Sequence, residues 1–146
     1  MTGLEYLRAL AAGDAAGAPI AELMGIEAIE AEEGRIVFAG VPGPQHYNPI
    51  GTVHGGFAAT LLDSALGCAV HTTLPAGVGY TSLELKVNFT RPITTETGRV
   101  LCEGKVVHRG SRVATAEARL TAEQTGKLLA HGTTTCLIIP LNGAAA

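Results

Sequence analysis

The longest apolar stretch of the chain, Val53–Leu74, limits the possible folds more than any other feature. It is too long for one strand and contains few β-branched residues in its middle, so it is predicted to be a helix that ends before Pro75 and Gly77. Because most of its circumference is apolar, such a helix needs cover on several sides. We therefore expect a sheet to wrap around it.

Strand-like segments lie on both sides of this helix in the sequence. Two strands with a turn at Glu33-Gly34 are predicted within residues 24–41, after two short helices at residues 3–12 and from Pro19 to near Gly25. Four strands are predicted after the long helix, at about residues 81–89, 99–108, 112–121 and 128–139. This order predicts one α+β domain over residues 1–146, with an antiparallel sheet and a core at about residues 20–140.

Asp63 is the only charged side chain between Gln45 and Glu84, histidines aside. At about 100° per residue, the helix has a broad apolar face, and Asp63 lies on a narrow face of small and polar residues. Partial burial there would make the carboxylate a stronger base unless donors stabilise it. The helix alone leaves open that Asp63 lies on a solvated stripe or pairs structurally. The broad face carries Phe57, Leu61, Leu62, Ala65, Leu66 and Ala69, and the narrow face carries Thr60, Ser64, Gly67 and His71.

The loop before the helix ends in His54-Gly55-Gly56, directly at the predicted helix start. Helix N-termini present unpaired N–H groups and a partial positive charge, and glycines let a ligand oxygen reach the backbone closely. Such a terminus could stabilise a developing oxyanion. Asn48, earlier in the loop, offers an amide for a carbonyl or a water. Taken alone, the glycine motif is equally compatible with an ordinary helix start.

Composition and charge bear on partners and location. The net charge of −3 and the lack of a basic tract give no support for a nucleic-acid partner. No apolar run reaches the ~20 residues that span a bilayer, and residues 1–12 lack the pattern of a signal peptide, so no membrane partner and a cytoplasmic location are expected. Charged residues are only 16% of the chain, which fits hidden oligomer surface or an Ala-rich globule equally well.

The three cysteines, Cys68, Cys102 and Cys136, are far apart and lie among apolar residues. Their spacing does not match a zinc site, so buried free thiols are predicted, with no metal. No cofactor is expected.

The combination Asn48-x-x-Gly51-x-x-His54-Gly55-Gly56, followed by Asp63 in an Ala/Leu helix, closely resembles the PaaI-type (phenylacetic acid degradation) acyl-CoA thioesterases of the hotdog superfamily. Segments 84–92 and 106–112 fit as well, and the resemblance spans about residues 20–140. It implies the hotdog fold, a long central helix wrapped by a curved antiparallel β-sheet. It also implies a homodimer with paired sheets, often assembled into a homotetramer, whose active sites use residues from both chains.

The resemblance assigns roles to individual residues. Asp63 would activate a water as general base, or attack the thioester as nucleophile. The Gly55 N–H would polarise the carbonyl, and Asn48 would bind that carbonyl or orient the water. His54 would support the loop or bond near the thioester. Ser82 would help to place the water from the partner subunit, although a strand Ser that faces solvent is an equal alternative.

Two parts of an acyl-CoA substrate need further contacts. The coenzyme A phosphates need cationic or backbone groups, for which the candidates in or beside turns are Arg91, Arg109, Ser111 and Arg112, each also explicable as an ordinary surface residue. The acyl group needs an apolar pocket, and the candidates that could line one for an aryl or an alkyl chain are Phe57, Leu61, Tyr80 and Tyr47.

The expected function is hydrolysis of an aryl- or medium-chain acyl-CoA to the free acid and coenzyme A. Gly67 stands one turn after Asp63, where a related hotdog group with a catalytic Glu has Thr, which favours the Asp-type mechanism. A hotdog hydratase or dehydratase is one alternative, but its histidine motif is not evident. A non-catalytic acyl-CoA-binding protein is the other, but it would not need a carboxylate beside the thioester.

Overall fold

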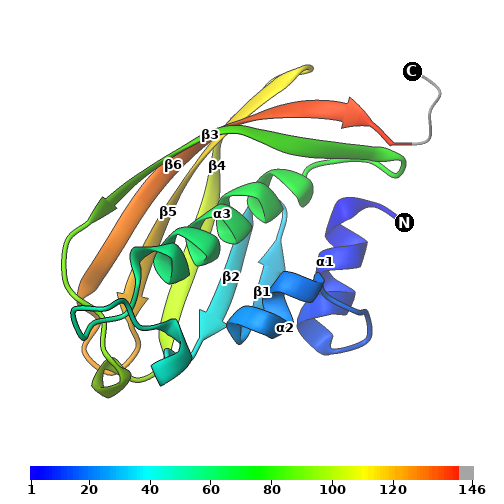
Figure 1. Cartoon of the computed structure of the whole chain (residues 1–146). Coiled ribbons are helices and arrows are strands. Elements are labelled where there is room, and N and C mark those ends of the chain that lie inside the picture. The colour runs from blue at the N-terminus through cyan, green and yellow to red at the C-terminus, as the bar shows by residue number, and fades with distance from the viewer. Residues whose placement is uncertain (142–146) are drawn as a thin grey trace.

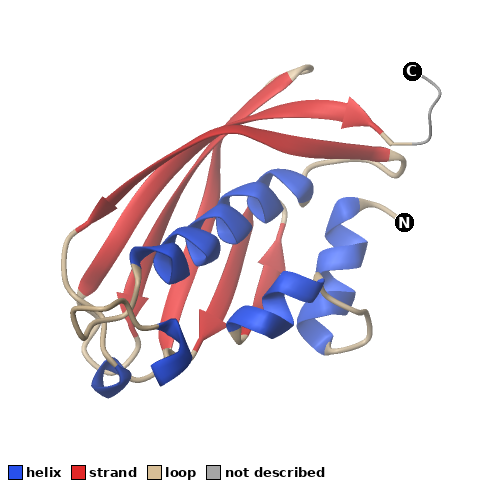
Figure 2. Cartoon of the chain, viewed as in Figure 1, coloured by secondary structure: helices blue, strands red, loops and turns tan. Residues whose placement is uncertain are grey.

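A computed structural model describes residues 1–141 of the chain. One long helix lies across the concave side of a curved sheet, and two shorter helices stand beside it (Figures 1 and 2). The elements in chain order are α1 (Gly3–Ala12), α2 (Pro19–Met24), β1 (Ile26–Glu32), β2 (Arg35–Gly40), a 3₁₀ turn (Pro44–His46), α3 (Gly55–His71), β3 (Val78–Phe89), a 3₁₀ turn (Thr95–Thr97), β4 (Val100–Arg109), β5 (Val113–Ala122) and β6 (Leu128–Pro140).

The strands form one six-stranded sheet in the order β1-β2-β4-β5-β6-β3, and every neighbouring pair is antiparallel. Irregularities in register occur between residues 28 and 30, between 106 and 108, and between 82 and 84. Such bulges increase the local twist, which helps the sheet to curve around α3. Strands β1 and β3 are the two edges.

The packing of α3 follows its sequence pattern. Its predicted apolar face is buried completely, as Phe57, Leu61 and Ala65 illustrate. Strand β4 passes so close that a Cβ on Gly104 would collide with the Ala65 carbonyl oxygen, so only glycine fits at this crossing. The predicted α+β class, with a long helix wrapped by a curved antiparallel sheet, is confirmed.

The N-terminal helices pack at the C-terminal end of α3. The Gly3 N–H donates to the Leu74 carbonyl at 3.1 Å, and a Cβ on Gly3 would collide with the His71 carbonyl oxygen. Leu7 of α1 is fully buried, whereas α2 buries no residue completely. Helices α1 and α2 therefore extend the helical layer beside α3, on the β1 side of the sheet (Figure 1).

The predicted helices and strands are present within about three residues of their expected ends. The long helix is shorter than its apolar stretch. It begins at Gly55, after the His54 cap, and it ends at His71. The two 3₁₀ turns were not predicted. No helix within residues 1–141 is long and apolar enough to cross a membrane.

Candidate active site

Asp63 and Ser82 meet where β3 crosses α3. Asp63 lies in the third turn of α3 and is exposed, and the Ser82 hydroxyl donates to its Oδ1 at 3.1 Å. Ser82 sits beside the β3 irregularity, opposite Cys136 of β6. The contact is made within one chain, and the role of Ser82 in placing a water across two subunits stays a prediction. In the single chain Asp63 is not partly buried, which fits the solvated stripe that the sequence left open.

Tyr80 lies two residues before Ser82 on the same strand and covers α3 one turn beyond Asp63. A Cβ on Gly67 would lie 2.5 Å from Tyr80 Cε2 and 2.7 Å from its hydroxyl oxygen. The tyrosine ring therefore takes the space that a larger side chain at position 67 would need. This contact explains why Gly67 is buried although it shares the narrow polar face with Asp63.

The thiol and the phenol next to Asp63 are both held in their neutral forms. Burial raises the pKa of Cys68 to about 11, against a hydrogen bond with Tyr80 that lowers it. Burial, followed by the charge of Cys68, likewise raises the pKa of Tyr80. The Cys68 sulfur and the Tyr80 oxygen lie 3.9 Å apart. Since the thiolate is the nucleophilic form of cysteine, Cys68 is a poor nucleophile at neutral pH, and Asp63 stays the better candidate.

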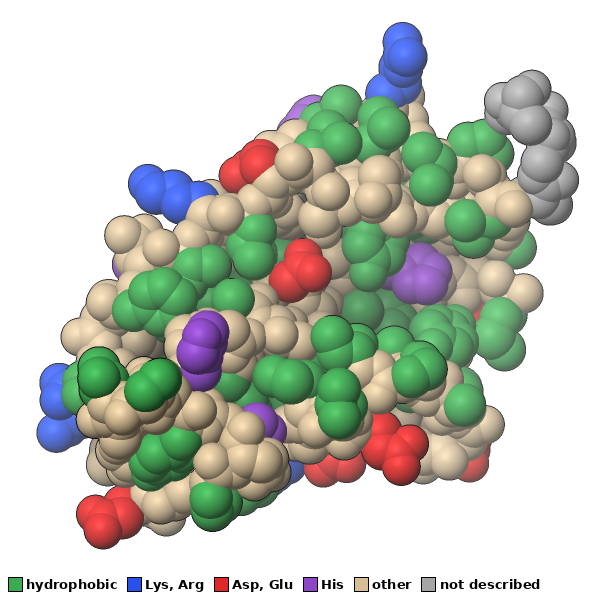
Figure 3. Space-filling model, viewed as in Figure 1, with side chains coloured by type: hydrophobic (Ala, Val, Ile, Leu, Met, Phe, Trp, Pro, Cys, Tyr) green, Lys and Arg blue, Asp and Glu red, His purple; other side chains and the backbone are tan. Residues whose placement is uncertain are grey.

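A cavity of about 900 Å³ opens at Asp63 and extends between α3, β1 and the two N-terminal helices. Figure 3 shows a hollow in the molecular surface on this side. Apolar side chains surround the hollow, and an acidic and a histidine side chain lie beside it. His71 lines the cavity, with its ring centroid 5.8 Å from that of Tyr6 and 5.7 Å from that of Tyr80. Burial lowers the pKa of His71, which favours the neutral imidazole.

The start of α3 is fixed by two histidines. The His54 Nδ1 accepts from the Gly56 N–H at 2.8 Å as the N-cap, and the His54 N–H donates to the His46 carbonyl at 2.7 Å. His46 is buried, accepts from the Gly43 N–H and lies against Phe57 with ring centroids 4.4 Å apart. These contacts of His54 tie the loop to the start of α3.

The Gly55 N–H is a candidate donor for a substrate. No hydrogen bond within residues 1–141 uses it. The ring of Phe89 lies beside it, since a Cβ on Gly55 would be 3.0 Å from Phe89 Cζ. Gly55 is the first residue of α3, where the N–H points out of the helix end.

Asn48 holds its own loop together. Its Oδ1 accepts from the N–H groups of Ile50 and Thr52, and its Nδ2 donates to the Thr52 hydroxyl at 3.0 Å. An amide nitrogen carries two hydrogens, so this bond uses one of them. The second is the part of Asn48 that could contact a carbonyl or a water.

The four candidate coenzyme A contacts lie at two ends of the sheet. Arg91 lines a pocket of about 390 Å³ together with His54, Gly55 and Phe89, and its N–H donates to Leu129 of β6. Arg109 ends β4, and Ser111 and Arg112 lie in the turn to β5, next to Val113, which pairs with Leu137 of β6. At about 3.3 Å per residue, Leu129 and Leu137 are ~26 Å apart along β6. The structure therefore brings only Arg91 to the helix start.

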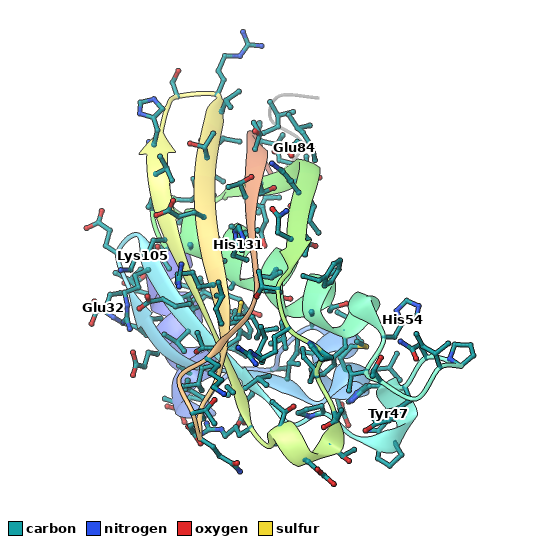
Figure 4. All side chains as sticks on the ribbon, turned by 90° about the vertical axis from the view of Figure 1, so that its left-hand side faces the viewer. Glu32, Tyr47, His54, Glu84, Lys105 and His131 are labelled. Carbon is teal, nitrogen blue, oxygen red and sulfur yellow. The ribbon has the colours of Figure 1, made fainter. Side chains whose placement is uncertain are left out.

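The predicted catalytic residues form two separate groups in one chain. Asp63 and Ser82 form one group, and Asn48, His54 and Gly55 form the other at the helix start. Gly55 and Asp63 are two turns apart on α3, or ~12 Å at 1.5 Å per residue. One thioester cannot contact both groups within a single chain. His54 lies on the loop beside Tyr47, far from Glu84 of β3 (Figure 4).

The four residues predicted to line an acyl pocket do not lie together. Tyr80 lines the cavity, but Phe57 and Leu61 are 2% and 0% exposed and belong to the core. Tyr47 lies elsewhere, where its hydroxyl accepts from the Thr95 N–H. The walls from α1 and α2 were missed, because nothing in their sequence signals that they approach Asp63. Residues 1–141 contain no cluster of three His, Cys, Asp or Glu side chains that could hold a metal ion.

Comparison with known protein sequences finds similarity to thioesterases. A family model described as the thioesterase superfamily matches residues 50–129. Acyl-coenzyme A thioesterase 13 of Homo sapiens is 30% identical over 107 residues, which cover 73% of this chain and 75% of that protein. The protein of the same name from Mus musculus is 33% identical over 88 residues, 60% of this chain. The match covers 61% of the mouse protein, so this chain spans less than two thirds of that relative.

Solved structures of other proteins have a similar fold. The phenylacetic acid degradation protein PaaI of Thermus thermophilus is 31% identical with a TM-score of 0.74, over 82% of this chain and 98% of that chain. A phenylacetic acid degradation-related protein of Ralstonia eutropha JMP134 is 28% identical with a TM-score of 0.80, over 90% and 98% of the two chains. The E. coli PaaI protein, at 21% identity, a TM-score of 0.81 and coverage of 94% and 96%, shows the shared fold.

Proposed function

Because the chain belongs to the thioesterase superfamily, we propose that it hydrolyses the thioester of an acyl-coenzyme A with Asp63 as the catalytic carboxylate. The observation that carries this proposal is the Ser82–Asp63 hydrogen bond at the mouth of a large cavity. An exposed carboxylate that accepts one hydroxyl keeps its other oxygen for a water or a carbonyl carbon. The free acid and coenzyme A are the products.

Two routes use the same carboxylate. As general base, Asp63 takes a proton from a water while that water attacks the thioester carbon, and the thiolate of coenzyme A leaves. As nucleophile, Asp63 attacks the carbon itself, and water then hydrolyses the mixed anhydride. A single turnover in H₂¹⁸O identifies the second route when water attacks the aspartyl carbonyl of the mixed anhydride, whereas attack at the acyl carbonyl labels the product acid in both routes. The label enters the product acid in the first route, and it enters the Asp63 carboxylate in the second if water attacks the aspartyl carbonyl.

We infer that the second group of residues comes from a partner chain in a homodimer. Strand β3 is an unpaired edge, and it exposes large apolar side chains, with Leu83 at 57% and Phe89 at 59% exposure. Ser82 lies near the start of β3, and Gly55 lies beside its end. Antiparallel pairing of two β3 edges about a two-fold axis would therefore place each Asp63 close to the partner's Gly55. Such pairing would also cover an exposed edge.

In this assembly each residue of the helix start has a defined task. The Gly55 N–H polarises the thioester carbonyl and stabilises the oxyanion as it forms. The free amide hydrogen of Asn48 contacts the same carbonyl or the water, and His54 keeps the loop in place by capping α3. Arg91 binds a phosphate of coenzyme A. The β4–β5 turn of the opposite chain lies at the same end, so Arg109, Ser111 and Arg112 add to that phosphate site from across the dimer.

Subunit complementation tests the shared site. Asp63→Asn removes the carboxylate, and Gly55→Pro removes the N–H while keeping a residue that suits the first position of a helix. Gly55→Ala is the matched control, because it adds a Cβ beside Phe89 but keeps the N–H. Both inactive variants, refolded together as an equal mixture, should regain about a quarter of the wild-type rate, since half of the dimers then hold one intact site.

Two results would contradict the shared site. The first is a mixture that stays as inactive as its components, although mixed dimers are present. The second is a monomeric protein in solution that retains full activity. Loss of activity in Gly55→Ala equal to that in Gly55→Pro would show that the Cβ, and not the missing N–H, is responsible.

A further inference from the structure

The cavity at Asp63 and the pocket at Gly55 differ in charge. Among the described residues that line the cavity, the charged groups are Asp63, Glu22 and Glu27, with no Lys or Arg. The pocket at Gly55 contains Arg91 and, among the described residues, no carboxylate. The phosphates of coenzyme A are therefore repelled from the cavity and attracted to the pocket. This difference fixes the orientation of an acyl-CoA that reaches across the proposed dimer.

The walls of the cavity are mostly apolar and include both small and large side chains. They come from α1, α2 and the loop between them, from β1, and from residues of β2, α3 and β3. The contributing residues include Leu7, Leu10, Ala11, Ala21, Ala28 and Phe38. The volume of about 900 Å³ lies at the upper end of the ~300–1,000 Å³ typical of small-molecule pockets. A single aromatic ring would fill only part of it.

The cavity also extends a long way from the carboxylate. It is lined by Asp63 in the middle of α3 and by residues 16–18 of the loop between α1 and α2. A flexible chain can follow this path from a thioester at Asp63 towards the N-terminal helices. Glu22 and Glu27 are both exposed at the edge of the cavity, so a second carboxylate at the far end of the acyl group would meet like charge.

We propose that this cavity is the acyl-binding pocket and that it takes an uncharged, straight alkyl chain, with helices α1 and α2 setting the chain length that is accepted. The proposal rests on the thioesterase function proposed above and adds the class of acyl group. Each methylene buried in an apolar pocket strengthens binding by about fourfold. The pocket therefore favours long acyl groups over short ones and over those with a terminal carboxylate.

One pair of variants on α1 isolates the pocket. Ala11 lines the cavity, and Ala9, two residues earlier and equally half-buried, does not. Ala11→Phe places a ring in the path of the chain, and Ala9→Phe adds the same ring outside it. The kcat/KM values are measured for butanoyl-, dodecanoyl-, dodecanedioyl- and phenylacetyl-CoA. For the wild type and Ala9→Phe, dodecanoyl-CoA should be the best of the four by at least about tenfold.

For Ala11→Phe, the ratio of kcat/KM for dodecanoyl-CoA to that for butanoyl-CoA should fall at least about tenfold. An equal ratio in Ala11→Phe and Ala9→Phe overturns the pocket. A wild-type preference for phenylacetyl-CoA or dodecanedioyl-CoA over dodecanoyl-CoA overturns the alkyl class. Circular dichroism checks that each variant is folded, and if Ala11→Phe is not, Ala21→Phe on α2 takes its place.

Calorimetry separates failure of the pocket from failure of the function. Dodecanoyl-CoA is titrated into Asp63→Asn, with and without Ala11→Phe, where no turnover is expected. If the wild type hydrolyses nothing but Ala11→Phe still weakens binding at least about tenfold, the hydrolase proposal is wrong and the pocket stands. If hydrolysis proceeds and Ala11→Phe changes neither binding nor the rate ratio, the pocket is wrong and the hydrolase stands.

Discussion

The Ser82 hydroxyl donates to Asp63 Oδ1 at 3.1 Å and joins the edge strand β3 to the middle of α3. A hydrogen bond to a charged group contributes about 1.5–3 kcal/mol. If Ser82 orients the carboxylate for catalysis, Ser82→Ala should lower kcat by roughly 10- to 150-fold, with a small effect on KM. Ser82→Thr keeps a hydroxyl and should recover much of the loss. Steady-state kinetics that show equal kcat for Ser82→Ala and the wild type would rule out this role.

The contact between Gly67 and Tyr80 predicts a coupled effect on stability. Gly67→Ala forces the tyrosine ring to move, because the new Cβ would lie 2.5 Å from Cε2. Overpacking of this kind costs about 1–3 kcal/mol, against which better helix propensity returns up to ~1 kcal/mol. In a Tyr80→Ala background the same change should be neutral or stabilising. Urea unfolding of the four proteins measures the coupling, and strictly additive free energies of unfolding would show that the contact has no effect.

The His71 imidazole predicts a dependence of stability on pH. Burial lowers the pKa of His71 in the folded protein below its ordinary value of 6.5. Between these two pKa values the unfolded chain binds a proton that the folded chain does not, so stability falls as the pH drops from about 7 towards 5. His71→Gln removes the titrating group and should flatten this part of the profile.

The control for His71 is His108→Gln, which removes an exposed histidine at the end of β4. Urea midpoints at about pH 5, 6 and 7 are compared for the three proteins. The wild type and His108→Gln should lose stability together as the pH falls, and His71→Gln should lose less. Identical slopes for both variants would exclude His71 as the cause.

The cap that His54 forms on α3 predicts separate effects on stability and on activity. Its Nδ1 accepts from the Gly56 N–H at 2.8 Å, so His54→Ala should cost about 0.5–2 kcal/mol. His54→Asn supplies another good cap and should recover this stability. If His54 only supports the loop, His54→Asn also recovers kcat/KM. Full stability without recovered activity would instead show that the imidazole contacts the substrate.

Regular patterns explain why most of the fold could be predicted from the sequence. Apolar and polar residues alternate from residue 81 to residue 89, as in a strand, and the apolar residues of α3 repeat with the period of a helix. Both periods follow from the backbone geometry of the element, so the sequence is enough to predict them. The helix ends could be predicted less well, because the cap by His54 depends on one side-chain hydrogen bond. The 3₁₀ turns at residues 44–46 and 95–97 are too short to leave such a pattern.

The candidate site could be predicted as a set of residue types but not as a geometry. Asp63 stands out in the sequence because its neighbours are apolar, and Gly55 because it opens the helix. Their separation into two groups follows from the rise along α3, but the contact of Ser82 with Asp63 in the same chain depends on the register of β3. The position of α1 and α2 as walls of the cavity at Asp63 depends on tertiary packing alone. No pattern in residues 3–24 predicts that packing.

The role of Asp63 is tested by the rate of thiol release from dodecanoyl-CoA, measured for the wild type and for Asp63→Asn. Asparagine keeps the size of the side chain and can still accept from Ser82, but it is neither a base nor a nucleophile. If Asp63 is the catalytic carboxylate, we expect ready hydrolysis by the wild type and a loss of roughly a thousandfold or more in kcat for Asp63→Asn, with dodecanoyl-CoA still bound. Hydrolysis by Asp63→Asn at the wild-type rate would show that Asp63 is not the catalytic carboxylate.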